Sequence, residues 1–309
     1  MSDKRLPVLC TTSEFGSYSD EPLELLRRSS IALDLNPFKR KISEAEILDL
    51  LSKKPYVGLL AGLEPLTSQV LSSSKLKVIS RVGVGLDNVD IEAAKTYGIR
   101  VYNTPGVLTE AVAELTIGLM ITALRGISLA DRKMRQNIWA RHMGTLLEKK
   151  VVGVIGFGAI GQRVSDILKA FGAEVIFYDT REIHSKIPQV PLAELLSRSD
   201  VVTVHASGNS TIIGAGEIRG MKDGAVIINT ARGGLVDERA LYDALRSGKV
   251  AWAALDVYGE EPYYGKLLEL DNVTLTPHMG SYAKEARISM EIVAVKNLIK
   301  GFKEAGLYE

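Results

Sequence analysis

The feature of this sequence that most constrains its fold is an apolar strand followed directly by a glycine-rich turn. Val151–Ile155 is a β-branched run typical of a buried parallel strand, and Gly156, Gly158 and Gly161 follow it in G-x-G-x-x-G spacing. In this motif the first glycine allows a tight turn, the second lets the backbone approach a pyrophosphate, and the third lets the next helix pack closely. The free N–H groups at the start of that helix suit phosphate groups. The motif therefore predicts a dinucleotide site.

The next strand predicts which dinucleotide binds. Glu174–Tyr178 ends at Asp179, which lies 18 positions after Gly161, close to the roughly 20 expected for the acid that holds a ribose. An aspartate there accepts hydrogen bonds from the 2′-hydroxyl of NAD and repels a 2′-phosphate, although Arg181 leaves some tolerance for NADP open. A glycine turn that only packs a helix would need no such acid. We therefore predict NAD as the cofactor.

Length and composition narrow the class of protein. A chain of 309 residues predicts two domains of about 150 residues each. Because 38 basic residues balance 37 acidic ones, no overall positive field would attract nucleic acid or an anionic membrane. The sequence has neither a signal-peptide pattern nor an apolar segment of bilayer length, so we expect a cytoplasmic protein. Cys10 is the only cysteine, which excludes an intrachain disulfide and a cysteine-built metal site, and no metal is expected.

Strands and helices alternate along the chain, which predicts an α/β protein with two parallel sheets flanked by helices. In the first hundred residues the expected strands are Leu6–Leu9, Ile31–Leu35, Tyr56–Leu60 and Leu76–Ser80. After Asp179 they are Val201–Val204, Ala225–Ile228, Ala251–Leu255 and Val273–Leu275. Among the expected helices, Ser43–Leu51 begins with the capping-box pattern of Ser43 and Glu46.

Two further helices and one turn organise the domains. Leu108–Leu124 is apolar around most of its circumference and is expected to be buried between domains or between subunits. Asn103–Gly106 is rich in turn residues and marks a domain boundary. Ala283–Phe302 forms one long amphipathic helix, long enough to return to the first domain.

A second glycine pair follows the strand Leu76–Ser80. Gly83 and Gly85 resemble the start of a dinucleotide turn, but no acid-bearing strand follows them. This pattern favours a site where backbone N–H groups bind a small anion. The alternative is that both glycines only turn the chain.

Three polar residues follow strands of the second half, where an open parallel sheet forms its ligand crevice. Arg232 precedes two glycines and offers a fork of donors suited to a carboxylate. His278 can titrate near neutral pH, and Glu261 could stabilise its protonated form and fix its tautomer. Taken singly, these residues could be a capping ion pair, a turn histidine and a solvated loop charge. Beside a nicotinamide site they indicate the reduction of a 2-oxo acid.

The order of these motifs resembles the NAD-dependent D-isomer-specific 2-hydroxyacid dehydrogenases over nearly the whole chain. The resemblance rests on SRVGVGLDNVD, NTPG, AVAELTIGLM, VVGVIGFGAIGQRV, MKDGAVIINTARGGLVDE, AALDVYGEEP and TPHMGSY. It implies a Rossmann-type NAD-binding domain at 103–284 and a flavodoxin-like substrate domain from 1–102 and 285–309. It also implies a homodimer formed largely by residues 108–145, with a small 2-hydroxy acid as substrate.

The resemblance also implies roles for individual residues. Arg232 would bind the substrate carboxylate and carbonyl, and His278, paired with Glu261, would be the acid and base. The backbone at Val84 and Gly85 would hold the substrate carboxylate. Asp256 would contact the nicotinamide amide. The full set of expected cofactor contacts is Gly156, Gly158, Ala159, Ile160, Gly161, Asp179, Thr230 and Asp256.

Within the family, the chain resembles short-form D-3-phosphoglycerate dehydrogenases, and the expected substrate is 3-phosphoglycerate. Arg81 and Arg141 stand where that group has basic residues near the phosphate. Glu64, in AGLEPLT, is instead a carboxylate that would oppose a phosphate. The alternatives are a glyoxylate or hydroxypyruvate reductase and, from another class, a non-catalytic NAD sensor. A methyltransferase on a similar sheet is disfavoured by the complete glycine motif.

Overall fold

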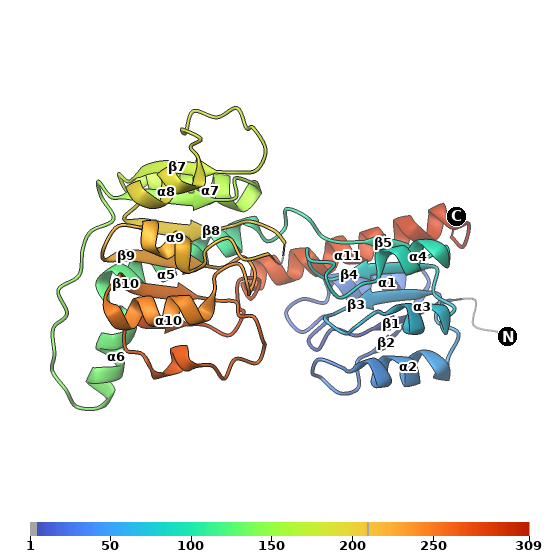
Figure 1. Ribbon diagram of the computed structural model, residues 1–309. Coiled ribbons are helices and arrows are strands. Elements are labelled where there is room, and N and C mark those ends of the chain that lie inside the picture. Colours follow the sequence, from blue (N-terminus) through green and yellow to red (C-terminus); the bar gives the residue numbers. More distant parts are fainter. Residues whose placement is uncertain (1–4, 209, 309) are drawn as a thin grey trace. The chain divides into compact units, whose positions relative to one another are not determined.

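The computed structural model describes residues 5–208 and 210–308 and divides into two compact units (Figure 1). Unit 1 comprises Met1–Leu108 and Tyr282–Glu309, and unit 2 comprises Thr109–Ser281. The bounds expected from the sequence differ by a few residues, because 103–108 group with unit 1, and so do 282–284. The C-terminal helix belongs to unit 1. The substrate-binding role of unit 1 stays a prediction.

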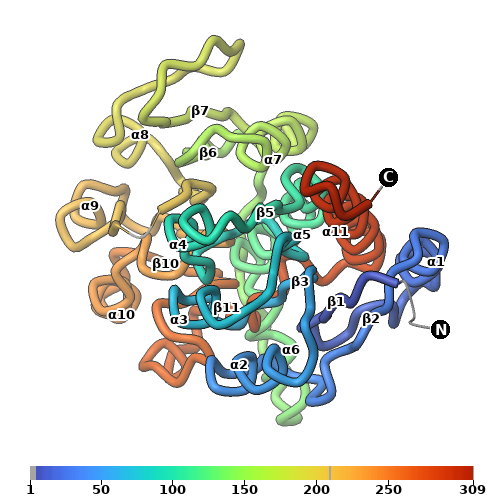
Figure 2. Tube along the Cα trace, turned by 90° about the vertical axis from the view of Figure 1, so that its right-hand side faces the viewer, coloured from blue at the N-terminus to red at the C-terminus, as the bar shows by residue number. Residues whose placement is uncertain are grey.

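Unit 1 is built on a parallel sheet with the strand order β2-β1-β3-β4-β5. Its strands are β1 (Leu6–Cys10), β2 (Ile31–Leu35), β3 (Gly58–Ala61), β4 (Val78–Arg81) and β5 (Arg100–Tyr102). Its helices are α1 (Glu21–Arg28), α2 (Glu44–Lys53), α3 (Ser68–Ser72), α4 (Ile91–Thr96) and α11 (Lys284–Glu304). Val8 packs on one face in a cluster with residues of α1 and α11, while Leu9 packs on the other with residues of α2, α3 and α4. Figure 2 shows α1 and α11 side by side, as their contacts require.

Local sequence signals explain several of these elements. The capping box predicted at Ser43 is confirmed, because Ser43 Oγ accepts from Glu46 N at 3.3 Å and Glu46 Oε2 accepts from Ser43 N at 2.8 Å. The sequence prediction missed α4, which Asp90 caps by accepting from Ala93 N. It also missed β5, which has three residues and is too short to show a periodic pattern.

Unit 2 has a second parallel sheet, with the strand order β11-β10-β9-β8-β6-β7. Its strands are β6 (Val151–Ile155), β7 (Glu174–Tyr178), β8 (Val201–Val204), β9 (Ala225–Asn229), β10 (Val250–Leu255) and β11 (Val273–Leu275). Its helices are α5 (Thr109–Arg125), α6 (Ile127–Arg135), α7 (Ala159–Ala170), α8 (Leu192–Arg198), α9 (Ala215–Gly220) and α10 (Glu238–Ser247), with a short 3₁₀ helix at Lys266–Glu269. The predicted fold class, two helix-flanked parallel sheets, is confirmed.

Helix α5 is buried inside unit 2. Met120 and Ala113 are fully buried and pack with residues of α7 and of the sheet. In the described residues no single helix has the length and apolar content of a membrane span, although α5 and α6, bent by 66° relative to each other, meet that composition test together. Contacts inside unit 2 therefore explain the burial that the sequence predicted for α5.

Each sheet has one point where the strand order reverses, which is where parallel sheets open a crevice at their carboxyl ends. In unit 1 this switch point lies between β1 and β3, and in unit 2 it lies between β6 and β8. The segments that follow these four strands are therefore the first places to look for ligand-binding residues.

Candidate active site and cofactor site

The glycine turn after β6 has the geometry of a phosphate-binding turn. Gly158 is the N-cap of α7, and a Cβ added there would meet nothing within 4 Å, which leaves room for a ligand. A Cβ added at Gly161 would lie 2.1 Å from the carbonyl oxygen of Gly156. Only glycine at 161 therefore lets α7 start this close to the turn. Ala159 and Ile160 form the first turn of α7 between these two glycines.

Asp179 follows β7 and is tied to this turn. Its Oδ2 accepts from Phe157 N at 2.9 Å, and its Oδ1 accepts from the backbone and side chain of Arg181 at 3.0 and 3.2 Å. Burial opposes ionisation, but the hydrogen bonds from Phe157 and Arg181 outweigh it and hold the pKa of Asp179 below its usual value. An ionised carboxylate beside the turn is suited to accept the hydroxyl groups of a ribose.

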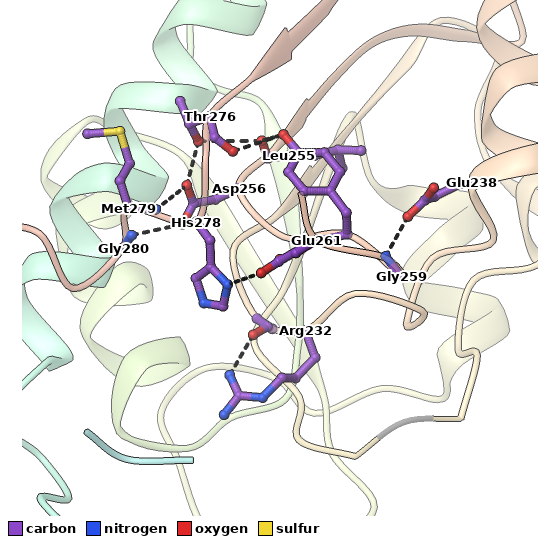
Figure 3. Close-up of polar contacts among 12 residues, drawn as sticks. Arg232, Glu238, Leu255, Asp256, Gly259, Glu261, Thr276, His278, Met279 and Gly280 are labelled. Atoms are coloured by element: carbon purple, nitrogen blue, oxygen red, sulfur yellow. Dashed lines mark hydrogen bonds and ion pairs between the residues drawn. The ribbon is translucent and has the colours of Figure 1, made fainter. Parts of the chain in front are cut away.

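A buried carboxylate, Asp256, organises the segment that carries His278 (Figure 3). Asp256 follows β10, and its Oδ1 accepts from Thr276 Oγ1 at 2.6 Å and from Met279 N at 2.8 Å. Its Oδ2 accepts from Gly280 N at 2.8 Å. Because these donors flank His278 in sequence, Asp256 fixes the position of the histidine. Charge-assisted hydrogen bonds of this kind are among the stronger ones.

His278 and Glu261 form a direct pair. His278 Nδ1 lies 2.8 Å from Glu261 Oε2, and the other carboxylate oxygen, Oε1, accepts from Tyr258 N at 3.1 Å (Figure 3). Their side chains are 46% and 37% exposed, so both remain reachable from solvent. With an ionised glutamate at Nδ1, that nitrogen carries a proton and Nε2 is left to exchange protons with a ligand. The pair has the arrangement of a general acid and base.

Arg232 joins the same site from a third loop, after β9 (Figure 3). Asn229 Nδ2 donates to Arg232 O at 3.0 Å, and Arg232 NH1 donates to Ala231 O at 2.8 Å. A Cβ at Gly233 would lie 1.7 Å from Tyr258 O, so glycine is required for this loop to pack on the segment that precedes Glu261. Arg232, Glu261 and His278 thus share the carboxyl ends of β9, β10 and β11.

The predicted anion loop lies at the carboxyl end of β4 in unit 1. Asn103 Nδ2 donates to Val84 O at 2.7 Å, and Thr104 N donates to Gly83 O at 3.0 Å, which fixes the loop. In the described part of the chain no hydrogen bond uses the N–H of Val84 or Gly85. Both donors are therefore available to an anion.

The two arginines expected near a phosphate have different surroundings. Arg81, the last residue of β4, packs its guanidinium against Gly83 and donates to Val82 O. Arg141 lies in the loop after α6, next to Leu129 and Lys133. The next residues of that loop, 142–145, line a cavity of about 340 Å³ together with 222–226, at the amino end of β9. Within unit 2, Arg141 is therefore not brought to the loops that carry Arg232 and His278.

The structure adds residues that the sequence did not single out. Thr276 and Tyr258 hold Asp256 and Glu261 in place. Thr230, an expected cofactor contact, is anchored by a 2.8 Å hydrogen bond between its Oγ1 and that of Thr116 on α5. Thr276 lies two positions before His278 in TLTPHMGS, so its closeness to the histidine could have marked it as a site residue. Thr116 could not be found from the sequence, because it lies 114 positions away from its partner Thr230.

Comparison with known proteins agrees with this geometry. Residues 117–280 match the family described as "D-isomer specific 2-hydroxyacid dehydrogenase, NAD binding domain". The chain belongs to this family. The matched residues lie within unit 2, and the predicted cofactor, NAD, is confirmed at the level of the family.

Individual relatives carry different substrate names. The chain is 42% identical over 255 residues to a hydroxypyruvate reductase of Thermotoga maritima, covering 78% of this chain and 82% of that one. It is 36% identical over 293 residues to a D-3-phosphoglycerate dehydrogenase of Archaeoglobus fulgidus, covering 91% of this chain but only 55% of that one. The chain thus spans about half the length of that relative. A crystal structure of a protein from Thermus thermophilus matches with a TM-score of 0.89 at 35% identity, covering 97% of each chain.

Proposed function

We propose that this chain catalyses reversible hydride transfer between NAD(H) and a small D-2-hydroxy acid and its 2-oxo acid. The observation that supports this best is the 2.8 Å pair of His278 and Glu261 beside Arg232, at the carboxyl ends of the NAD-binding sheet. An intact acid, base and guanidinium set is what an enzyme of this class needs. A protein that only senses NAD would not need it.

In the direction of reduction, the guanidinium of Arg232 binds the acid and polarises its carbonyl. Bound NADH supplies the hydride. His278 donates the proton on Nε2 to the forming alkoxide, and Glu261 stabilises the imidazolium that must be present beforehand. Asp256 keeps the histidine segment in position and is the expected contact for the nicotinamide amide. In unit 1, the N–H groups of Val84 and Gly85 are the expected donors to the substrate carboxylate.

There are two candidates for the exact substrate, one phosphorylated and one not. The sequence motifs and the relative of Archaeoglobus fulgidus favour 3-phosphoglycerate and 3-phosphohydroxypyruvate, with Arg81 as the expected phosphate contact. Arg141, the other arginine expected there, lies away from the loops of its own unit that carry Arg232 and His278. The relative of Thermotoga maritima favours hydroxypyruvate, and the buried Glu64 favours an unphosphorylated acid as well.

We also propose that the enzyme is a cytoplasmic homodimer. The loop 136–146 exposes Trp139 and Met143 at 78% and 93%. Large apolar side chains exposed in one segment indicate a surface that another chain covers. Light scattering should give twice the mass of the 309-residue chain, and Trp139→Ser should lower it.

The test of the reaction is the loss of NADH absorbance with phosphohydroxypyruvate, hydroxypyruvate, glyoxylate and pyruvate. At least one acid should be turned over, and His278→Ala should lower kcat by about 10²–10⁴ while NADH affinity is nearly kept. NADH binding without turnover of any acid would instead favour the sensor. Unaltered turnover in His278→Ala would remove this residue from the mechanism.

A further inference from the structure

The switch point of unit 1 holds a buried carboxylate. Glu64, just after β3, is 1% exposed. Its Oε1 accepts from Thr11 Oγ1 at 2.5 Å and from Gly62 N at 3.2 Å, so it joins the segments that follow β1 and β3. Burial raises the pKa of Glu64 above its usual value, while the hydrogen bonds from Thr11 and Gly62 and the charge of Arg81 favour the ionised form.

This carboxylate is part of the same small structure as the anion loop. Asn88 Nδ2 donates to Glu64 O at 2.6 Å and to Gly62 O at 3.3 Å, and Val82 N donates to Ala61 O at 2.9 Å. The segments 61–64 and 82–88 are therefore held together by hydrogen bonds at the carboxyl ends of adjacent strands. A ligand bound at Val84 and Gly85 is fixed relative to Glu64.

This edge carries two acidic side chains, Glu64 and Asp87, and one basic side chain, Arg81. Arg81 is the cation that acts on Glu64, and its charge favours the ionised carboxylate. The exposed side chains in these segments are the apolar Leu63 (54%) and Val84 (38%) and the acidic Asp87. A monoanionic acid can use the free N–H donors at Val84 and Gly85. A phosphate added to the same acid brings about two more negative charges toward a buried carboxylate and two aliphatic side chains.

We propose that Glu64 determines specificity by excluding phosphorylated acids, so that this site selects unphosphorylated 2-oxo acids with short, uncharged side chains. This inference rests on the proposed dehydrogenase function and narrows its substrate class. Like charges inside a protein repel more strongly than in water, which makes a carboxylate at this position a filter against a dianion. Thr11 acts as a positioning residue, because its hydroxyl holds the carboxylate in place.

The experiment compares hydroxypyruvate with 3-phosphohydroxypyruvate, which differ only in the phosphate. The measured quantity is the ratio of kcat/KM for the phosphorylated acid to that for the unphosphorylated acid. We expect a ratio well below one in the unsubstituted protein and a rise of about tenfold or more in Glu64→Gln, which removes the charge but keeps the shape. Leu63→Lys changes only an exposed side chain, so it should fold and should raise the ratio similarly.

The matched control is Glu304→Gln. Glu304 lies at the end of α11 and contacts Arg100 and Tyr102, the first and last residues of the short strand β5. The Glu304→Gln variant removes one negative charge from the same unit but leaves the segment around Glu64 unaltered. The kcat/KM ratio of the two acids should therefore stay unchanged. An unsubstituted protein that prefers the phosphorylated acid would overturn the inference. So would an unchanged ratio in Leu63→Lys and in folded Glu64→Gln.

Calorimetric binding of D-glycerate and 3-phospho-D-glycerate in the presence of NADH separates this inference from the proposed function. If no 2-oxo acid is turned over but Glu64→Gln still improves binding of the phosphorylated acid about tenfold relative to D-glycerate, the function fails and the specificity role stands. If turnover is found but neither ratio responds to Glu64→Gln or Leu63→Lys, the function stands and the specificity role fails.

Discussion

The two switch points of this chain have the same backbone architecture and different contents. In unit 2, the turn that follows β6 is open, with nothing within 4 Å of a Cβ at Gly158. In unit 1, the corresponding space between β1 and β3 is occupied by Glu64 and Thr11. Because both sheets are parallel and reverse in the same way, the difference comes from the first few residues after each strand. In unit 2 those residues leave room for a pyrophosphate, whereas in unit 1 they hold a hydrogen-bonded carboxylate.

The buried titratable groups also differ. Near the open turn of unit 2, His205 follows β8, and burial lowers its pKa to about 3. Its Nε2 lies 2.9 Å from Thr203 Oγ1, and within the described residues its Nδ1 has no hydrogen-bond partner. In unit 1, burial raises the pKa of Glu64. Burial opposes the charged form of both groups, but at Glu64 the hydrogen bonds from Thr11 and Gly62 and the charge of Arg81 favour ionisation. Acidification should therefore weaken unit 2.

The largest expected effect comes from closing the open turn. Gly158→Val places a side chain where the pyrophosphate must approach, so the Kd for NADH should rise at least about 100-fold while the fold is kept. Gly161→Val should lose NADH binding and also lower stability, because its Cβ would lie 2.1 Å from Gly156 O. Titration calorimetry and thermal unfolding measure the two effects. Normal NADH binding by Gly158→Val would show that this turn is not the phosphate site.

The second prediction concerns pH and unit 2. Neutral His205 has a folded-state pKa of about 3, below the unfolded value of about 6.5. Between these values the unfolded state binds more protons, so stability is lost as the pH falls below about 6.5. The free energy of unfolding of unit 2 should fall by about 2 kcal/mol between about pH 7 and pH 5 from this group alone.

Tryptophan fluorescence can follow this loss specifically, because Trp139 and Trp252 are the only tryptophans and both belong to unit 2. His205→Gln should remove this part of the pH dependence, whereas His184→Gln, at an exposed histidine, should not. An identical pH dependence in all three proteins would mean that His205 is protonated in the folded state at ordinary acidity.

Sequence patterns predicted what depends on local spacing. The glycine turn, the strands β6 and β7 and the cap at Ser43 follow from residues within a few positions of one another, and each was found. The placement of His278, Glu261 and Arg232 after three strands also followed, because the carboxyl ends of parallel strands meet at one edge.

Contacts between distant segments could not be predicted in this way. Thr11 and Glu64 are 53 positions apart, and nothing in either segment indicates that their side chains meet. The hydrogen bonds from the segment around His278 to Asp256 depend on the register between β10 and β11. Short elements such as α4 and β5 carry too few residues for a periodic signal.

The smallest expected effect tests the filled switch point itself. Thr11→Val keeps the size of the side chain but removes the hydroxyl that donates to Glu64 Oε1 and accepts from Gly62 N at 2.9 Å. Leaving buried polar groups without this partner should lower the free energy of unfolding of unit 1 by about 1–2 kcal/mol. In urea, circular dichroism should show an earlier transition, while tryptophan fluorescence, which reports on unit 2, and NADH affinity should not change. Thr11→Ser, which keeps the hydroxyl, should lose less stability. A loss in Thr11→Ser with no loss in Thr11→Val would mean that packing of the methyl group, and not the hydrogen bond to Glu64, stabilises this edge of unit 1.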